Sequence, residues 1–293
     1  MADVGLALGP DDLVLAHWTM ASATFEERCI AAAAGGFAGF GILPDVYLDA
    51  RRSGLTDVDL RAMVESYGVR MSQLEAVSIA GPDTEALVDS QLAVHWHLAD
   101  LFGARELGVV GRPGHDRHRQ LLRFRKICDD AAPRGIIVGV EFIQQVARFE
   151  SIRPTLHFVC AAARDNGGLI LDSFHHFRGA NDWGQLDELP GWRVMMIQLS
   201  DALMPPECGT YLDDTVHRRR IPGDGSFPLQ RFIRTLDAKG VRCPITVEVL
   251  SDELASLGPE EQGRRLGEGT RSFLQAARAS RPQAFGHDVT SGT

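Results

Sequence analysis

The chain has 293 residues, of which 44% are hydrophobic and 24% charged, a composition typical of a globular protein with a sizeable core. Its net charge of −9 disfavours nucleic acid as a partner, because an acidic surface repels a polyanion. No apolar run approaches the ~18 residues of a membrane span, and the acidic start of the chain lacks the basic segment of a signal peptide. We therefore expect a cytoplasmic protein that binds neither membrane nor nucleic acid.

Short apolar runs alternate with amphipathic segments along the whole chain. In chain order, strands are expected at 13–16, 37–43, 69–77, 107–110, 136–142, 168–172, 194–200 and 245–249. Helices are expected at 23–34, 57–67, 83–102, 116–132, 154–164, 227–238 and 259–277. Eight short strands, most of them followed by a helix, predict an α/β protein with a single (β/α)8 TIM barrel, a fold of ~250 residues.

No linker and no change of composition divides the chain. Residues 1–280 are therefore expected to form one barrel domain, and residues 281–293 a flexible C-terminal tail. A doubly wound open sheet is the alternative architecture. It is weakened because neither a GxGxxG motif nor a P-loop follows the first strand.

Four consecutive strands in the second half of the chain each place one oxygen-bearing side chain near the carboxyl end. Side chains alternate between the two faces of a strand, so apolar neighbours such as Val140 and Val247 face the helices. The opposite face then directs four side chains into the mouth of the barrel: Glu141, Asp172, Gln198 and Glu248. Each acid taken alone is more often a surface or capping residue, but three acids and one glutamine at matching strand positions argue for a shared site.

Three carboxylates that converge in a site of low dielectric repel one another unless a cation lies among them. Oxygen-only ligation favours one hard divalent ion, Mn²⁺ or Mg²⁺, with Co²⁺ and Zn²⁺ as alternatives. The five scattered cysteines contain no CxxC pair, so a zinc–thiolate site is not expected.

Further side chains are candidates for contacts with a substrate. His175 lies three residues past Asp172, on the loop expected after the sixth strand, where it can shuttle a proton or bind a hydroxyl group. Arg219 belongs to a basic loop after the seventh strand, and a guanidinium there suits a phosphate, carboxylate or polyol oxygen. Glu75, at the expected end of the third strand, and His17, after the first strand, are weaker candidates.

The chain resembles the sugar phosphate isomerase/epimerase family of xylose isomerase-like TIM barrels, from about Leu13 to Leu274. The motifs that carry the resemblance are GVEF around Glu141, LDSFH at 171–175, IQLSDA at 197–202, RxxPGxG at 219–225 and TVEV around Glu248. The resemblance implies that Glu141, Asp172, the residue at position 198 and Glu248 bind one divalent metal ion. It also implies that His175 contacts substrate and that the two glutamates transfer protons.

Position 198 departs from the family pattern. It is usually histidine in the isomerases and epimerases, whereas this chain has Gln198, which is similar to the 3-dehydroshikimate dehydratase branch of the superfamily. A glutamine still offers a carbonyl oxygen to a hard ion.

These features predict a metal-dependent enzyme acting on a small polyhydroxylated carbonyl compound, such as a keto-sugar or a cyclic keto acid. The metal acidifies a C–H group beside the carbonyl, and Glu141 or Glu248 takes the proton. Returning the proton elsewhere gives isomerisation or epimerisation, the reaction expected first, whereas expelling a hydroxyl gives dehydration. A non-catalytic sugar-binding barrel and a repair endonuclease are further alternatives, and the endonuclease would need more histidine ligands and a basic groove. Barrels of this kind often pair, so a homo-oligomer is compatible with the sequence.

Overall fold

Eight parallel strands close into a barrel in the computed structural model, which describes residues 8–79, 85–113, 116–146, 148–207 and 209–279. Each strand pairs with its neighbours in the sequence, and β8 pairs with β1 to complete the ring. The strands are β1 (Leu13–Leu15), β2 (Gly39–Ile42), β3 (Met71–Ile79), β4 (Glu106–Gly111), β5 (Ile137–Glu141), β6 (Gly167–Asp172), β7 (Val194–Leu199) and β8 (Ile245–Val247). The predicted TIM barrel is thereby confirmed.

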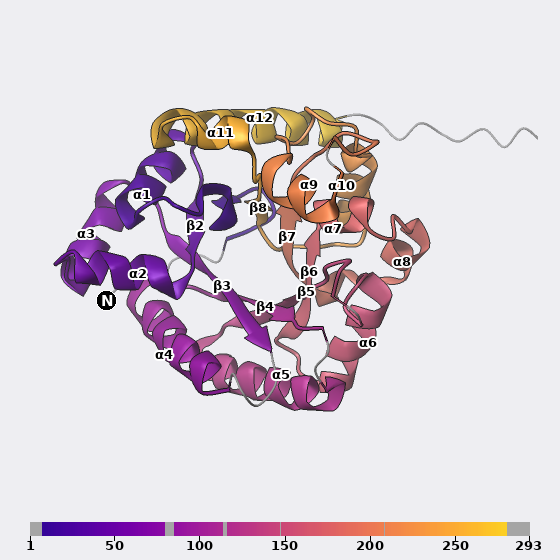
Figure 1. Cartoon of the computed structure of the whole chain (residues 1–293), viewed down its shortest axis with the longest axis horizontal. Helices are drawn as coiled ribbons and strands as arrows, with labels where there is room; N and C mark the ends of the chain where they lie inside the picture. Colours follow the sequence, from indigo (N-terminus) through magenta and orange to yellow (C-terminus); the bar gives the residue numbers. More distant parts are fainter. Residues whose placement is uncertain (1–7, 80–84, 114–115, 147, 208, 280–293) are drawn as a thin grey trace, which may run out of the picture.

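Helices surround the barrel on all sides (Figure 1). They are α1 (Phe25–Ala34), α2 (Pro44–Arg52), α3 (Asp57–Ser66), α4 (Glu85–Phe102), α5 (Arg117–Ala131), α6 (Ile152–Ala162), α7 (Ser173–Arg178), α8 (Trp183–Glu188), α9 (Tyr211–His217), α10 (Leu229–Ala238), α11 (Asp252–Ala255) and α12 (Pro259–Ala279). Among the described residues, no helix combines the length and the hydrophobicity needed to cross a membrane.

Every expected strand is present, with ends that differ by a few residues, and the seven long helices are also found. The helices α2, α7, α8, α9 and α11 were not expected, because such short segments do not show a full apolar period. Pro44 follows the second expected strand and is the first residue of α2, where its fixed φ suits a helix start. The expected tail at 281–293 lies outside the described residues.

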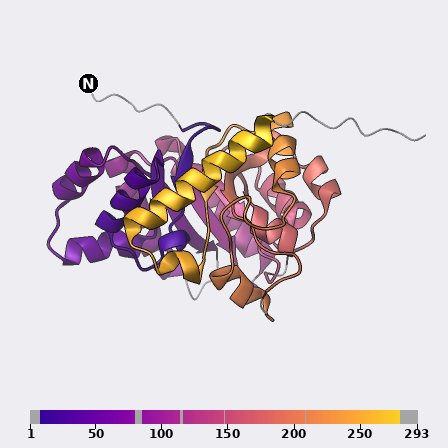
Figure 2. The same ribbon diagram turned by 90° about the horizontal axis from the view of Figure 1, so that it is seen from above.

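The last helix, α12, packs against the first helix, α1. Figure 2 shows α12 running along one side of the barrel, where it packs against α1 and α10. Gly263 permits this close approach, since a Cβ atom there would lie 2.0 Å from the carbonyl oxygen of Ala31 in α1. The barrel is therefore held closed by a helix–helix contact as well as by the pairing of β1 with β8.

The barrel interior contains a layer of polar side chains that includes the first residue of β4 and the third residue of β3. The amide nitrogen of Gln73 donates to the carboxyl group of Glu106 and to the hydroxyl of Thr246, each at 2.6 Å. All three residues are buried. Burial raises the pKa of Glu106 to about 7, against the opposing hydrogen bond from Gln73 and with a further contribution from the charge of Glu75. The fold therefore carries a carboxyl group that resists ionisation.

We expect Glu106→Gln to flatten the pH dependence of stability in the metal-free protein. A carboxyl whose pKa rises from 4.5 to about 7 on folding stabilises the fold fully below pH 4.5 and loses that contribution as the pH approaches 7. The loss amounts to about 3 kcal/mol of unfolding free energy, at about 1.4 kcal/mol per pKa unit. Urea unfolding at a series of pH values measures it, with the exposed Glu65→Gln as control. An unchanged slope in Glu106→Gln would contradict the assignment.

Candidate active site at the carboxyl ends of β5 to β8

Four predicted ligands lie at the carboxyl ends of consecutive strands. Glu141 and Asp172 are the last residues of β5 and β6, Gln198 is near the end of β7, and Glu248 directly follows β8. The strand register aligns Asp172 with Gln198 and Gln198 with Thr246, two residues before Glu248. The predicted alternation therefore brings these side chains to one level of the barrel mouth.

Arg219 links two of these acids. Its Nη1 atom lies 3.0 Å from Asp172 Oδ2 and 3.0 Å from Glu248 Oε2. The guanidinium group is buried, stacks over the ring of Phe174 at 4.6 Å, and donates from Nε to the carbonyl oxygen of Thr215 at 3.0 Å. Buried carboxylates attract a buried cation, and Arg219 supplies one positive charge to a cluster with more than one negative charge.

The side chain of Gln198 is oriented by a single hydrogen bond. Its Nε2 atom donates to Glu248 Oε1 at 3.2 Å. Its Oε1 atom is buried and has no hydrogen-bond partner, which is costly for an amide oxygen. A cation beside this oxygen would satisfy it.

His175 does not lie on a loop, as the sequence suggested, but in the first turn of α7. The helix begins directly after β6 because Asp172 Oδ1 accepts a hydrogen bond from the backbone N–H of Phe174 at 2.6 Å. This short turn brings His175 Nε2 to 3.2 Å from Glu141 Oε1 and 3.5 Å from Asp172 Oδ2. Ligand atoms of Glu141, Asp172 and His175 lie within 4.8 Å of one another.

The two acids that share Arg219 differ in their pKa values. Burial raises the pKa of Glu248 well above its usual value, against the lowering effect of Arg219 and with further contributions from the charges of Asp172, Glu141 and Glu75. Burial also acts on Asp172, but the proximity of Arg219 and His175, with the hydrogen bond from Phe174, brings its pKa below the usual value. In the absence of a metal ion, Glu248 is therefore the acid that holds a proton most readily.

Glu75 and His17 form a layer beneath the mouth. Glu75 was expected at the end of the third strand, but β3 continues to Ile79, so this side chain lies in the middle of the strand. It accepts a hydrogen bond from the backbone N–H of His17 at 2.9 Å, and burial raises its pKa to about 7. Burial and the charge of Arg28 lower the pKa of His17 to about 3, so its imidazole is neutral.

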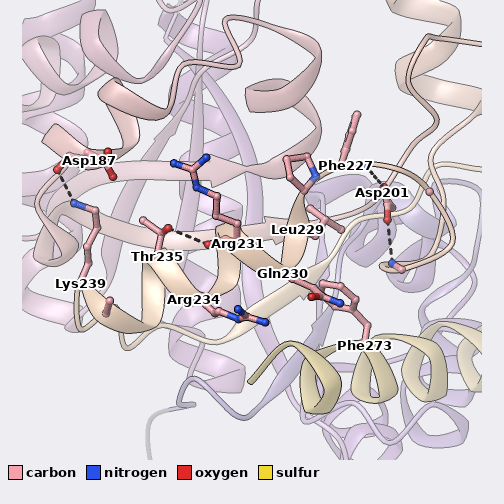
Figure 3. A pocket seen from close by; sticks show the side chains of 14 residues that line it. Asp187, Asp201, Phe227, Leu229, Gln230, Arg231, Arg234, Thr235, Lys239 and Phe273 are labelled. Atoms are coloured by element: carbon pink, nitrogen blue, oxygen red, sulfur yellow. Dashed lines mark hydrogen bonds between the residues drawn. The ribbon is translucent and has the colours of Figure 1, made fainter. Parts of the chain in front are cut away.

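The barrel interior is tightly filled below the site. A cavity of about 20 Å³, large enough for about one water molecule, is lined by Glu75, Glu141, Gln198, Gln73, Thr246 and five further residues. A wider hollow of about 880 Å³ lies outside the barrel, and its lining includes Arg231 and Arg234 of α10 and Phe273 of α12 (Figure 3). None of the predicted site residues lines this outer hollow.

One neighbour of the site was missed by sequence reasoning. Tyr211, the first residue of α9, places its hydroxyl group 2.5 Å from His175 Nδ1. It lies ten residues after Asp201 in a segment without apolar periodicity, so no signal in the sequence points to it.

The residues present fit a divalent ion. The carboxylates of Glu141, Asp172 and Glu248 supply negative charge, and the unpartnered Gln198 Oε1 supplies a neutral oxygen. This donor set is the one that hard ions prefer.

The profile of the xylose isomerase-like TIM barrel family matches residues 29–274. The chain belongs to this family. Its similarity to individual members is more distant. It is 33% identical over 129 residues to a 3-dehydroshikimate dehydratase of Pseudomonas aeruginosa, which covers 44% of this chain and 20% of the relative. It is 27% identical over 146 residues to an inosose isomerase of Bacillus licheniformis, which covers 50% of this chain and 51% of the relative.

The chain thus spans about one fifth of the length of the dehydratase and about half of the length of the inosose isomerase. Among solved structures, the crystal structure of the IOLI protein with a bound zinc atom is similar, with a TM-score of 0.80 and 17% identity. The likeness covers 92% of this chain and 100% of that chain and shows the shared fold. These two named relatives are a dehydratase and an isomerase.

A divalent ion bound by these residues is expected to displace the proton held by Glu248, because Glu248 must ionise to become a ligand and burial raises its pKa. The affinity for the ion should therefore fall by up to tenfold for each pH unit below the pKa of Glu248. Calorimetric titration with Mn²⁺ in two buffers of different ionisation enthalpy measures the released proton. In Glu248→Gln the release should disappear together with much of the affinity. Affinity that does not depend on pH in the wild type would contradict the raised pKa.

Proposed function

We propose that this protein is a divalent-metal-dependent enzyme that removes a proton from the carbon beside a carbonyl group of a polyhydroxylated substrate. We further propose that water is then lost, so that the enzyme is a dehydratase of hydroxylated cyclic keto acids of the 3-dehydroshikimate type. Gln198 carries this choice, because its buried, unpartnered oxygen takes the place of the histidine usual in the isomerases. The similarity to the Pseudomonas dehydratase supports it.

In this proposal Glu141, Asp172, Gln198 and Glu248 hold the ion, Mn²⁺ or Mg²⁺. When bound, the ion polarises the substrate carbonyl and makes the adjacent C–H group more acidic. We propose that the substrate is bound by three further residues, namely Arg219, His17 and Glu75. His17 offers a neutral imidazole to the substrate. Arg219 is the positively charged group among these three residues.

The proton path follows from the positions of Glu141 and His175. Glu141 is placed to take the proton from carbon, after which the C–H electron pair forms a C=C bond and the C–O bond of the neighbouring hydroxyl breaks. His175 Nε2 supplies a proton to the departing oxygen, which leaves as water. The proton on Glu141 then returns to Nε2 across the 3.2 Å that separates the two groups. Both residues end in their starting state.

Isomerisation or epimerisation is the second candidate. Its support is the presence of two carboxylates, Glu141 and Glu248, at the same site, since one can remove a proton and the other can return it to a different position. The similarity to inosose isomerases points to the same chemistry. The two candidates share the first proton transfer and differ in the fate of the hydroxyl group.

The metal site is tested by the metal content of the purified protein and of two variants. We expect about one divalent ion per chain in the wild type, and a loss of at least about tenfold in affinity in Glu141→Gln and Glu248→Gln, because each change removes a charged oxygen ligand. The matched control is Glu65→Gln, on the exposed face of α3. This variant should bind the divalent ion as the wild type does. A wild type that takes up no ion on soaking would overturn the mechanism.

The reaction is tested with 3-dehydroshikimate, inososes and ketoses in D₂O, followed by proton NMR. We expect loss of water from 3-dehydroshikimate, and a decrease in kcat of about 10²- to 10⁴-fold in His175→Gln, which removes the proton donor. Deuterium exchange and isomerisation of an inosose or ketose without loss of water would favour the second candidate. Binding without turnover of any of these compounds would leave a sugar-binding barrel.

A further inference from the structure

The hydroxyl group of Tyr211 and two carboxylates contact opposite sides of the His175 ring. Tyr211 Oη lies 2.5 Å from Nδ1, while Nε2 lies 3.2 Å from Glu141 Oε1 and 3.5 Å from Asp172 Oδ2. The His175 ring is buried, and the ring of Tyr211 lies nearly parallel to it, at an interplanar angle of 26°. Which ring nitrogen carries the proton therefore depends on these neighbours.

The available donors and acceptors determine the tautomer. Carboxylate oxygens only accept, so the nitrogen that faces Glu141 and Asp172 must carry a proton. In a neutral ring Nδ1 then carries no proton and can only accept a hydrogen bond. The hydroxyl of Tyr211, 2.5 Å from Nδ1, is the donor at hand. Both ring nitrogens then have a partner: Tyr211 O–H donates to Nδ1, and Nε2–H donates to the carboxylates.

We propose that Tyr211 is a positioning residue that holds His175 in the Nε2–H tautomer, so that this histidine donates a proton to substrate and does not ligate the metal. The consequence for catalysis rests on the proposed function, whereas the tautomer itself does not. The distances alone allow His175 to join Glu141 and Asp172 around an ion. A metal ligand needs a lone pair on Nε2, so a proton held there by the carboxylates competes with ligation.

The same contact strengthens His175 as a donor. When Nε2 gives up its proton, negative charge develops on the ring, and a hydrogen bond from Tyr211 to Nδ1 stabilises that charge. Phenylalanine at this position would keep the ring stacking and remove the donor.

The helix that carries Tyr211 is anchored independently of its hydroxyl group. Arg178 of α7 forms a buried ion pair with Asp214 of α9 and donates to the carbonyl oxygen of Leu203 at 2.6 Å. Arg219 donates to the carbonyl oxygen of Thr215 at 3.0 Å. Tyr211→Phe should therefore leave α9 in place, and an unchanged melting temperature checks this.

The chain offers a matched control. Tyr47 of α2 also places its hydroxyl beside a histidine, 3.1 Å from His97 Nε2, and also binds Asp57. This pair lies among α2, α3 and α4, on the outside of the barrel. Tyr47→Phe makes the same chemical change without touching the candidate site.

The test is ¹⁵N NMR of histidine side chains in the full chain at pH 8, with the His175 signal assigned from its loss in His175→Gln. We expect a protonated Nε2 and a bare Nδ1 in the wild type, unchanged after Zn²⁺ is added as a diamagnetic probe. Tyr211→Phe should give a mixture of tautomers, and Tyr47→Phe the wild-type pattern at His175. A proton on Nδ1, a ring protonated on both nitrogens, loss of the Nε2 proton on adding Zn²⁺, or an unchanged signal in Tyr211→Phe would each overturn the proposal.

Activity provides a second readout. With a substrate that the wild type turns over, Tyr211→Phe should lower kcat by about 10- to 100-fold and change KM much less, as expected for a residue that orients another. Equal kcat in Tyr211→Phe and wild type would overturn the catalytic consequence. Absence of turnover in the wild type would count against the proposed function, while the tautomer result would still decide the role of Tyr211.

Discussion

The structure depends on the balance of charge at the carboxyl ends of β5 to β8. Asp172 and Glu248 are buried and share a single guanidinium nitrogen of Arg219. Glu141 and Asp172 both lie beside Nε2 of His175. Burial raises the pKa of Glu248, and the neighbouring carboxylates add to that rise while Arg219 opposes it. The site is therefore electrostatically incomplete as a purely protein structure. An additional cation would balance the negative charge of these carboxylates. It would also give the buried Oε1 atom of Gln198 the partner that it lacks.

The loop that delivers Arg219 is held by an acid that takes no part in the charge cluster. Asp201, after β7, accepts hydrogen bonds from the backbone N–H groups of Gly223 and Phe227, each at 3.0 Å, and pairs its own backbone with Arg220. Gly225 is required here, because a Cβ atom would lie 2.2 Å from the Asp201 carboxylate. The RxxPGxG and QLSDA motifs therefore form one structural unit, which fixes the guanidinium group between its two acids.

The sequence predicted the barrel and the four oxygen ligands for a common reason. Strand alternation is local, and it alone assigns Glu141, Asp172, Gln198 and Glu248 to one face. What it missed depends on contacts between distant segments. His175 lies in a helix because Asp172 caps the next turn, and Tyr211 reaches His175 from a helix 36 residues further along the chain. The position of Glu75 was misjudged because β3 extends past it to Ile79, over a register shift between Leu74 and Val77 that alternation does not reveal.

The two halves of the barrel have different tasks. β5 to β8 supply the proposed ligands, whereas β1 and β3 supply His17 and Glu75, which contact each other and lie beneath the mouth. In the proposed mechanism, removal of a proton beside a carbonyl needs only the residues of β5 to β8. This step is shared by isomerases, epimerases and dehydratases. In this mechanism, the fate of the substrate hydroxyl depends on the groups around that centre, which include the tautomer of His175 and the charge of Arg219. The ligand Gln198 favours dehydration in the proposed mechanism, and Tyr211 acts on the same step through the proton donor His175.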